Sequence, residues 1–233
     1  MNEQAHDPSA RAQRLRIRFA CGPDAGRSDL GRTWREAFEA AGVEVSRGQG
    51  RRGQRLVFAA GLPQNVSSEG ELLDVVLARP VRPDELVVRV RAQLPAGVEL
   101  REAWQVGFGL PSLPSAVRWA DYEVDVPVTD GLDEAIAAFL ARETLSWRDT
   151  RGEKVREYDL RPLVQELRVE CARDGVARLA MRLRCDATGV GRPDQVVLAL
   201  GLALPLRTHR RRLVLADVSP ARDAWQRRGR FVG

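Results

Sequence analysis

Two arginine-rich segments are the parts of this 233-residue chain best suited to chemistry with anions. Guanidinium groups donate paired hydrogen bonds to phosphate and carboxylate groups and keep their charge at physiological pH. The sequence therefore predicts contacts with nucleic-acid phosphates, and such binding weakens as salt is added. The candidate nucleic-acid-binding residues are Arg47, Arg51, Arg52, Arg55, Arg207, His209, Arg210, Arg211 and Arg212.

The positive charge of the chain is concentrated in short stretches. The chain has 37 basic and 32 acidic residues, a net charge of +5 and a pI near 9.8. Residues 47–55, 207–212 and 227–230 hold eleven arginines and no acid, which leaves 26 basic against 32 acidic residues elsewhere. A basic footprint on a slightly acidic body favours an acidic partner. Lys154 is the only lysine, so the codon bias of a GC-rich genome is an alternative reason for the preference for arginine.

Gly48, Gly50 and Gly53 have the G-x-G-x-x-G spacing of a dinucleotide-binding turn. That turn precedes a helix, whose N-terminus binds the pyrophosphate. Here residues 55–58 follow and are typical of a strand, which disfavours a dinucleotide site. A loop that binds phosphate through arginines and backbone N–H groups fits better, and a solvated hairpin loop is the alternative.

The few histidines and cysteines argue against a metal site or a cofactor. No C-x-x-C spacing occurs, and we expect Cys171 and Cys185 to be small core residues. With only His6 and His209 in the chain, a Ser-His-Asp or Cys-His arrangement is not apparent. His209 suits a general base or a phosphate ligand, but a partly exposed strand histidine is the interpretation we favour.

Other polar and aromatic residues have structural interpretations beside functional ones. Asp29 is expected to cap a helix, and Asp159 to form an ion pair with a neighbouring arginine. Tyr122, Trp147 and Tyr158 are possible platforms for stacked bases, but core packing is the favoured role for each.

The order of apolar patterns predicts the fold class. Alternating Leu15, Ile17 and Phe19 indicate a strand, and residues 30–41 have helical spacing. The first half reads β-α-β-β-(β)-α-β, and residues 116–215 repeat this order, which is the split βαβ arrangement of ferredoxin-like folds. We therefore expect an α+β protein made of duplicated ferredoxin-like units, with two antiparallel sheets and helices on one face.

A short repeat supports the duplication. The triplets Arg-Pro-Asp at 82–84 and 192–194 are each followed by Leu-Pro, twelve residues after the arginine. The predicted organisation is a flexible tail (1–12), a first unit (13–106), a linker (107–115), a second unit (116–215) and a basic C-terminal tail (216–233).

Several short motifs occur in a characteristic order between residues 14 and 215. They are RLRIRF at 14–19, AG at 41–42, SSEGE at 67–71, LPAG at 94–97, ADYEV at 120–124, YDLRPLV at 158–164 and RPD at 192–194. In these the chain resembles the radical-SAM-linked bacterial family of unknown function, a domain fused to or encoded beside a B12-binding radical SAM protein. The motif residues of interest are Asp29, Tyr158, Asp159, Arg161, Arg192 and Asp194.

The chain departs from this family at two positions. The family's Ser-His-Leu-Asp is here residues 26–29, which keep only Asp29, and its Gly-Phe-Asn-Pro-His-Pro is here residues 48–53. Both family histidines are thus absent, so a site that depends on them is lost or replaced by arginines. The resemblance implies a radical SAM partner and an RNA context, and it supplies no activity.

Three functional hypotheses follow. The first is a non-catalytic accessory domain that binds RNA or a ribonucleoprotein through the arginine-rich segments during RNA modification. The second is a protein-interaction subunit that docks the radical SAM partner without binding RNA. The third, by fold analogy alone, is a metal-independent RNA nuclease, against which the shortage of histidine and lysine counts.

The apolar runs of the chain argue against membrane insertion. The longest, residues 196–206, has eleven residues, whereas a membrane-spanning helix needs about 20. The polar first twenty residues lack the apolar segment of a signal peptide, so we expect a cytoplasmic protein.

Overall fold

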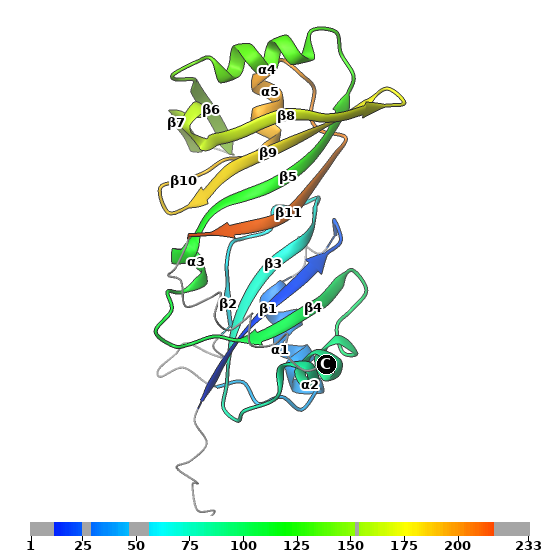
Figure 1. The fold of residues 1–233 in the computed structure, drawn as a ribbon, viewed down its shortest axis with the longest axis vertical. Coiled ribbons are helices and arrows are strands. Elements are labelled where there is room, and N and C mark those ends of the chain that lie inside the picture. The colour runs from blue at the N-terminus through cyan, green and yellow to red at the C-terminus, as the bar shows by residue number, and fades with distance from the viewer. Residues whose placement is uncertain (1–11, 25–28, 47–55, 152–153, 217–233) are drawn as a thin grey trace, which may run out of the picture.

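The computed structural model describes residues 12–24, 29–46, 56–151 and 154–216 (Figure 1). The strands are β1 (Gln13–Cys21), β2 (Leu56–Phe58), β3 (Val66–Leu77), β4 (Val98–Gln105), β5 (Val117–Pro127), β6 (Ser146–Arg151), β7 (Lys154–Asp159), β8 (Val164–Arg173), β9 (Val176–Asp186), β10 (Gly189–Val190) and β11 (Arg207–Leu215). The helices are α1 (Leu30–Ala40), α2 (Pro83–Arg91), α3 (Leu113–Ala116), α4 (Leu132–Leu140) and α5 (Pro193–Ala199), with a 3₁₀ turn at Arg161–Leu163.

Nine strands form one continuous sheet, which confirms the α+β class. The order is β10-β9-β5-β11-β3-β1-β4, with β2 also beside β3 and β8 also beside β9. Strands β6 and β7 form a separate hairpin. The pairs are antiparallel except for β11 and β3, which run parallel where the two halves of the molecule meet (Figure 1).

The two halves of the sheet have the same strand order. In the first half the fourth, first, third and second strands are β4, β1, β3 and β2; in the second half they are β11, β5, β9 and β8. Each half runs strand, helix, strand, strand, helix, strand along the chain when the short β10 and the β6–β7 hairpin are set aside.

The expected pair of separate sheets is instead one sheet, because β11 pairs with β3. Thr208 lies opposite Val66, and Arg210 lies opposite Ser68. Gly70 permits this approach, since a Cβ there would lie 2.3 Å from the carbonyl oxygen of Arg211. We call this β3–β11 junction the seam.

Helices cover one face of the sheet over two apolar cores (Figure 1). In the first half, Trp34 and Phe38 of α1 pack on the strands, and the Trp34 ring lies 5.1 Å from that of Phe19. In the second half, Val196 and Val197 of α5 join the core formed with α4, β5 and β9. The opposite face, which we call the helix-free face, carries both charged and apolar side chains. None of the described helices is long and apolar enough to cross a membrane.

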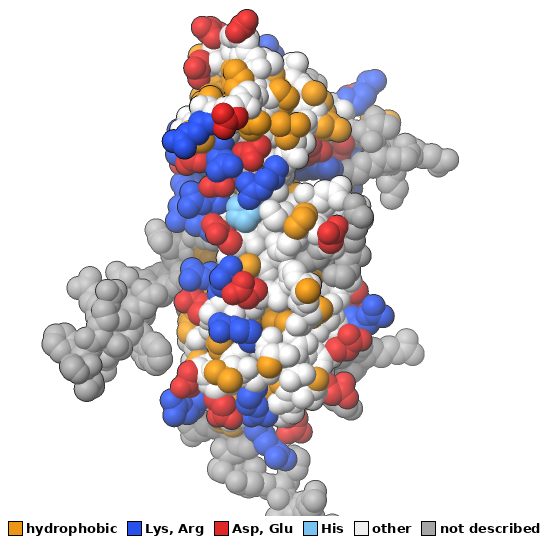
Figure 2. Space-filling model, turned by 90° about the vertical axis from the view of Figure 1, so that its right-hand side faces the viewer, with side chains coloured by type: hydrophobic (Ala, Val, Ile, Leu, Met, Phe, Trp, Pro, Cys, Tyr) orange, Lys and Arg blue, Asp and Glu red, His pale blue; other side chains and the backbone are white. Residues whose placement is uncertain are grey.

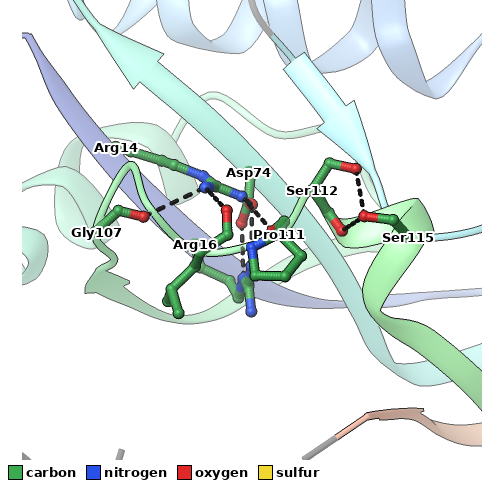
Figure 3. Close-up of polar contacts among 8 residues, drawn as sticks. Arg14, Arg16, Asp74, Gly107, Pro111, Ser112 and Ser115 are labelled. Carbon is green, nitrogen blue, oxygen red and sulfur yellow. Dashed lines mark hydrogen bonds and ion pairs between the residues drawn. The ribbon is translucent and has the colours of Figure 1, made fainter. Parts of the chain in front are cut away.

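The connection between the halves is fixed against the sheet by Arg14 (Figure 3). Its guanidinium donates hydrogen bonds to the carbonyl oxygens of Gly107 (3.3 Å), Leu110 (2.9 Å) and Pro111 (3.0 Å). The same group donates to Asp74, which also accepts hydrogen bonds from Arg16. The three side chains of this charged cluster are buried under the connection.

Candidate functional site

The helix-free face carries a groove of about 1130 Å³ that crosses the seam. Strands β1, β3 and β4 of the first half and β5, β8, β9 and β11 of the second contribute to it. The apolar and small lining residues are Gly70, Leu72, Ala103, Trp104, Tyr122, Ala180, Met181, Leu213 and Leu215. This groove is the candidate functional site.

The charges that line the groove balance. Its arginines are Arg18, Arg101, Arg168, Arg182, Arg211 and Arg212, and its carboxylates are Glu69, Glu102, Asp121, Glu123, Glu166 and Glu170. Figure 2 shows arginine and carboxylate side chains interspersed over the middle of the molecule. The groove therefore presents both signs of charge rather than a positive surface.

Pairing between strands explains why the basic segment 207–212 does not produce a positive patch. Arg207 lies opposite Asp125 in the sheet, and Arg212 lies opposite Asp121. The guanidinium nitrogens come within 3.5 Å of the Asp125 carboxylate and 2.7 Å of the Asp121 carboxylate. Both of these basic positions on β11 thus meet an acidic position on β5.

The aspartates of β5 are held in the charged form. Burial raises the pKa of the Asp121 carboxyl, but hydrogen bonds from Arg182 and Arg212 outweigh it and keep that pKa below its ordinary value. A hydrogen bond from Arg178 likewise lowers the pKa of Asp125, against the effect of burial. Both aspartates neutralise arginines throughout the physiological pH range.

Arg210, which the sequence suggested as a nucleic-acid-binding residue, is buried in the sheet and does not lie on the helix-free face. Its side chain is 1% exposed and donates hydrogen bonds of 2.7 and 2.6 Å to the Glu71 carboxylate and one of 3.0 Å to the carbonyl oxygen of Gly61. Arg210 lies opposite Tyr122, which is itself buried, and it is not among the residues that line the groove. The group is a buried ion pair and cannot contact a phosphate.

Three of the other candidate arginines are exposed, and four lie outside the residues that the structure describes. The side chains of Arg207, Arg211 and Arg212 are 47%, 53% and 64% exposed, and each has a carboxylate partner. Arg47, Arg51, Arg52 and Arg55 lie outside the described residues.

The seam brings together a serine and a histidine that the sequence analysis did not connect. His209 lies opposite Ser67, and the Ser67 Oγ atom lies 2.8 Å from His209 Nδ1. On the other side of the ring, Glu69 Oε1 lies 3.9 Å from His209 Nε2. The two partners are 142 residues apart in the chain, so only the parallel register of β3 and β11 reveals the contact.

Asp159 and Arg161 make hydrogen bonds to backbone groups around the start of β8. Asp159 accepts hydrogen bonds from the backbone N–H groups of Leu145 (2.7 Å) and Arg161 (3.0 Å), where an ion pair was expected. Arg161 donates to the carbonyl oxygens of Leu140 (3.1 Å) and Val164 (2.8 Å). The hydrogen bonds of the YDLRPLV motif therefore connect the start of β8 to the C-terminal end of α4.

The other motif residues also stabilise local structure. Arg192 donates hydrogen bonds to Asp194 (3.2 and 2.8 Å) at the start of α5. Arg82 and Asp84 make the same contact at the start of α2. Asp29 caps α1, as predicted, by accepting a hydrogen bond of 3.1 Å from the backbone N–H of residue 32.

The aromatic residues considered as stacking platforms lie in or against the core. Tyr122 is buried, and Trp147 and Tyr158 pack against the second core. The Tyr158 hydroxyl donates a hydrogen bond to the Oε1 atom of Gln195 on α5. This arrangement agrees with the core-packing interpretation.

The cysteines offer no metal or redox centre within the described part of the chain. Cys21 and Cys185 are buried, and burial raises the pKa of the Cys21 thiol to about 12. Cys171, which we expected in the core, is exposed on β8. Among residues whose placement is described, no three His, Cys, Asp or Glu side chains are grouped to hold a metal ion.

Comparison with known families identifies the class of protein. Residues 14–193 match the model of a family described as an uncharacterized protein conserved in bacteria (DUF2344). The chain belongs to this bacterial family, in agreement with the resemblance to a bacterial family of unknown function. A search of curated protein sequences gives no match.

Among solved structures, one similar chain comes from the crystal structure of a Cbf5–Nop10–Gar1 complex. It is 11% identical, with a TM-score of 0.46, and the match covers 85% of this chain and 48% of that one. The present chain thus spans about half the length of that relative. Another is a proposed glycine cleavage system transcriptional repressor, 14% identical, with a TM-score of 0.25 and coverage of 76% and 83%.

Proposed function

We propose that this chain is an accessory protein whose helix-free groove docks a protein partner, the radical SAM enzyme implied by the family resemblance. The observation that carries the proposal is the balance of six arginines and six carboxylates along the groove. Protein interfaces use interspersed charges of both signs to fix register and reject wrong partners. The partly exposed apolar lining residues, Ala103, Trp104, Ala180 and Leu215, supply the surface that such an interface buries.

The same balance counts against nucleic acid as the principal ligand of the groove. Binding of a phosphate backbone depends on net neutralisation of its charge by lysine and arginine. Carboxylates such as Glu102, Glu166 and Glu170 line the groove beside the arginines and would repel phosphates. The second hypothesis of the sequence analysis is therefore the better supported one.

Binding of RNA or a ribonucleoprotein is the second candidate, and one observation favours it. Arg207, Arg211 and Arg212 form a row of partly exposed guanidinium groups along β11. In this case the protein presents RNA to a radical SAM enzyme.

We also propose that the two halves are duplicated ferredoxin-like units. The units are residues 13–106 and 116–215, joined by 107–115 and flanked by tails at 1–12 and 216–233. The shared strand order of the halves supports this division, as does the same Arg-Pro-Asp contact at the start of α2 and α5.

The docking proposal is tested by binding to a purified B12-binding radical SAM protein from the same genome. The Arg101→Glu and Arg168→Glu variants reverse exposed charges that line the groove. We expect each to raise the dissociation constant at least about tenfold, because like charges would then face each other in the interface. Arg79→Glu, an exposed arginine outside the groove, is the matched control and should bind normally. Equal affinity of all variants would contradict the proposal.

The RNA alternative is tested with the same proteins. Fluorescent structured RNA and a polyanion of equal length are titrated at two salt concentrations. Binding that prefers RNA, survives physiological salt and weakens on Arg211→Ala and Arg212→Ala substitution would favour the second candidate. Weak binding that is equal for both polyanions and lost at physiological salt would leave the docking proposal.

A further inference from the structure

The seam places a hydroxyl, an imidazole and a carboxylate in a row. Ser67 Oγ lies 2.8 Å from one ring nitrogen of His209, and Glu69 Oε1 lies 3.9 Å from the other. A base that takes the proton of a nucleophile, and an acid that orients the base, form the working arrangement of nucleophilic hydrolases. Glu69 belongs both to this row and to the groove lining, whereas Ser67 and His209 do not line the groove.

The protonation state of His209 suits a general base. Burial lowers the pKa of the imidazole, and so does the positive charge of Arg207. Glu69 of β3 and Glu123 of β5 oppose this effect, while Arg211 adds to it, and the resulting pKa lies below the ordinary 6.5. The ring is therefore neutral at pH 7, so its Nδ1 atom is able to accept the proton of the serine hydroxyl.

The row lies beside the groove and is partly open to solvent. Ser67 and His209 are both partly exposed, and Glu69, Glu123 and Arg211 line the groove beside them. Arg207 and Arg211 both act electrostatically on the His209 ring and so lie near it. Their guanidinium groups add positive charge beside the ring, and each is paired with a carboxylate.

We propose that Ser67 is a nucleophile for hydrolysis of carboxylic esters, with His209 as its general base and Glu69 as the carboxylate that attracts the imidazolium once it has taken the proton. The Ser67 Oγ atom forms a bond to the carbonyl carbon, and its proton passes to His209 Nδ1. The alcohol leaves with that proton as its bond to the carbonyl carbon breaks. Water then attacks the acyl-serine, again with His209 as base, and releases the carboxylic acid and the free hydroxyl.

A fluorophosphonate probe tests the nucleophile directly, because a serine activated in this way displaces fluoride and keeps the phosphonyl group. We expect mass spectrometry to find the adduct on Ser67 of the full chain at pH 7.5. His209→Gln should slow its formation about 100-fold, the size of a general-base contribution. Ser112→Ala removes a serine that is hydrogen-bonded only within its own turn, and this control should leave the labelling rate unchanged.

Two further measurements show whether Ser67 is a nucleophile or whether its hydrogen bond to His209 only joins β3 to β11. Thermal unfolding shows whether each variant is folded, and the labelling rate against pH should fall with a midpoint below 6.5 as His209 becomes protonated. Hydrolysis of p-nitrophenyl acetate should be lost in Ser67→Ala and reduced in Glu69→Gln. Absence of the Ser67 adduct, or equal labelling in folded His209→Gln, would overturn the proposal.

Discussion

Arg210 and Glu71 form a buried ion pair across the seam, with hydrogen bonds of 2.7 and 2.6 Å between the guanidinium and the carboxylate. Arg210 comes from the last strand of the second half, and Glu71 comes from β3 of the first. Each group neutralises the charge of the other in a part of the sheet that is buried from water. The pair therefore makes the folding of each half depend on the other.

Removing one partner of this pair should be strongly destabilising. The Glu71→Gln substitution leaves the Arg210 guanidinium buried without a countercharge, and we expect a loss of about 3–5 kcal/mol in the free energy of unfolding. The double variant Glu71→Leu with Arg210→Met removes both charges and should recover most of this loss. Urea denaturation of the three proteins checks the prediction. A double variant no more stable than Glu71→Gln would show that the pair is not the cause.

Gly70 is predicted to be essential for the close approach of β11. A Cβ at this position would lie 2.3 Å from the carbonyl oxygen of Arg211 and 2.7 Å from the Cα of Arg212, and both are backbone atoms that cannot rotate away. We expect Gly70→Ala to cost at least about 1–3 kcal/mol, as overpacking does. Gly109→Ala is the control, because a Cβ there meets no atom within 4 Å. Equal urea midpoints for the two variants would contradict the prediction.

We expect Arg14 to keep the connection between the halves ordered. Its three hydrogen bonds to backbone carbonyls of residues 107–111 are charge-assisted, so Arg14→Ala should destabilise the protein by about 2–3 kcal/mol. Hydrogen exchange should become faster at 107–115 before it changes in the strands. Arg14→Lys should not restore protection, because a single ammonium cannot reproduce the forked guanidinium geometry. Unchanged exchange in Arg14→Ala would show that other contacts hold the connection.

Stability should fall in two separate stages as the pH is lowered. The pKa of His209 lies below 6.5 in the folded protein, so the unfolded chain binds this proton first and stability decreases as the pH falls below 6.5. The pKa values of Asp121 and Asp125 lie below 3.8, so the stability that these carboxylates provide is lost as the pH falls through 3.8 and lower.

The His209→Gln variant separates the two stages. It should lose the decrease between pH 7.5 and 5.5 and keep the decrease below pH 4. Melting temperatures measured from pH 7.5 to 3 provide the comparison. A first stage of equal size in this variant would assign it to another group.

Local features of the fold could be predicted from the sequence because they depend on neighbouring residues. The cap at Asp29 and the helix starts at Pro83 and Pro193 are set by contacts within a few positions. Alternating and helical spacing likewise predicted an α+β protein, since each element must bury one face. The merging of the halves into one sheet depends on a register between distant strands, and no local pattern encodes it.

The candidate site was harder to predict for the same reason. The arginines of 207–212 stand out in the sequence, whereas the carboxylates that neutralise them belong to β3 and β5, more than 80 residues earlier. Arg210 was misjudged because its strand contains basic residues on both faces, and only burial against Glu71 separates it from the others. The Ser67–His209 contact arises only where these strands pair.

The seam joins unlike strand edges, the third strand of one half and the last strand of the other. Such head-to-tail joining does not close on itself, so a last-strand edge (β4) and a second-strand edge (β8) are left at opposite ends of the sheet. Backbone pairing alone would allow further copies to add there and grow into a filament. Glu99 and Arg101 on β4, with Arg168 and Glu170 on β8, place exposed charges at these ends. Charged edges resist pairing with another chain, so these residues disfavour such growth.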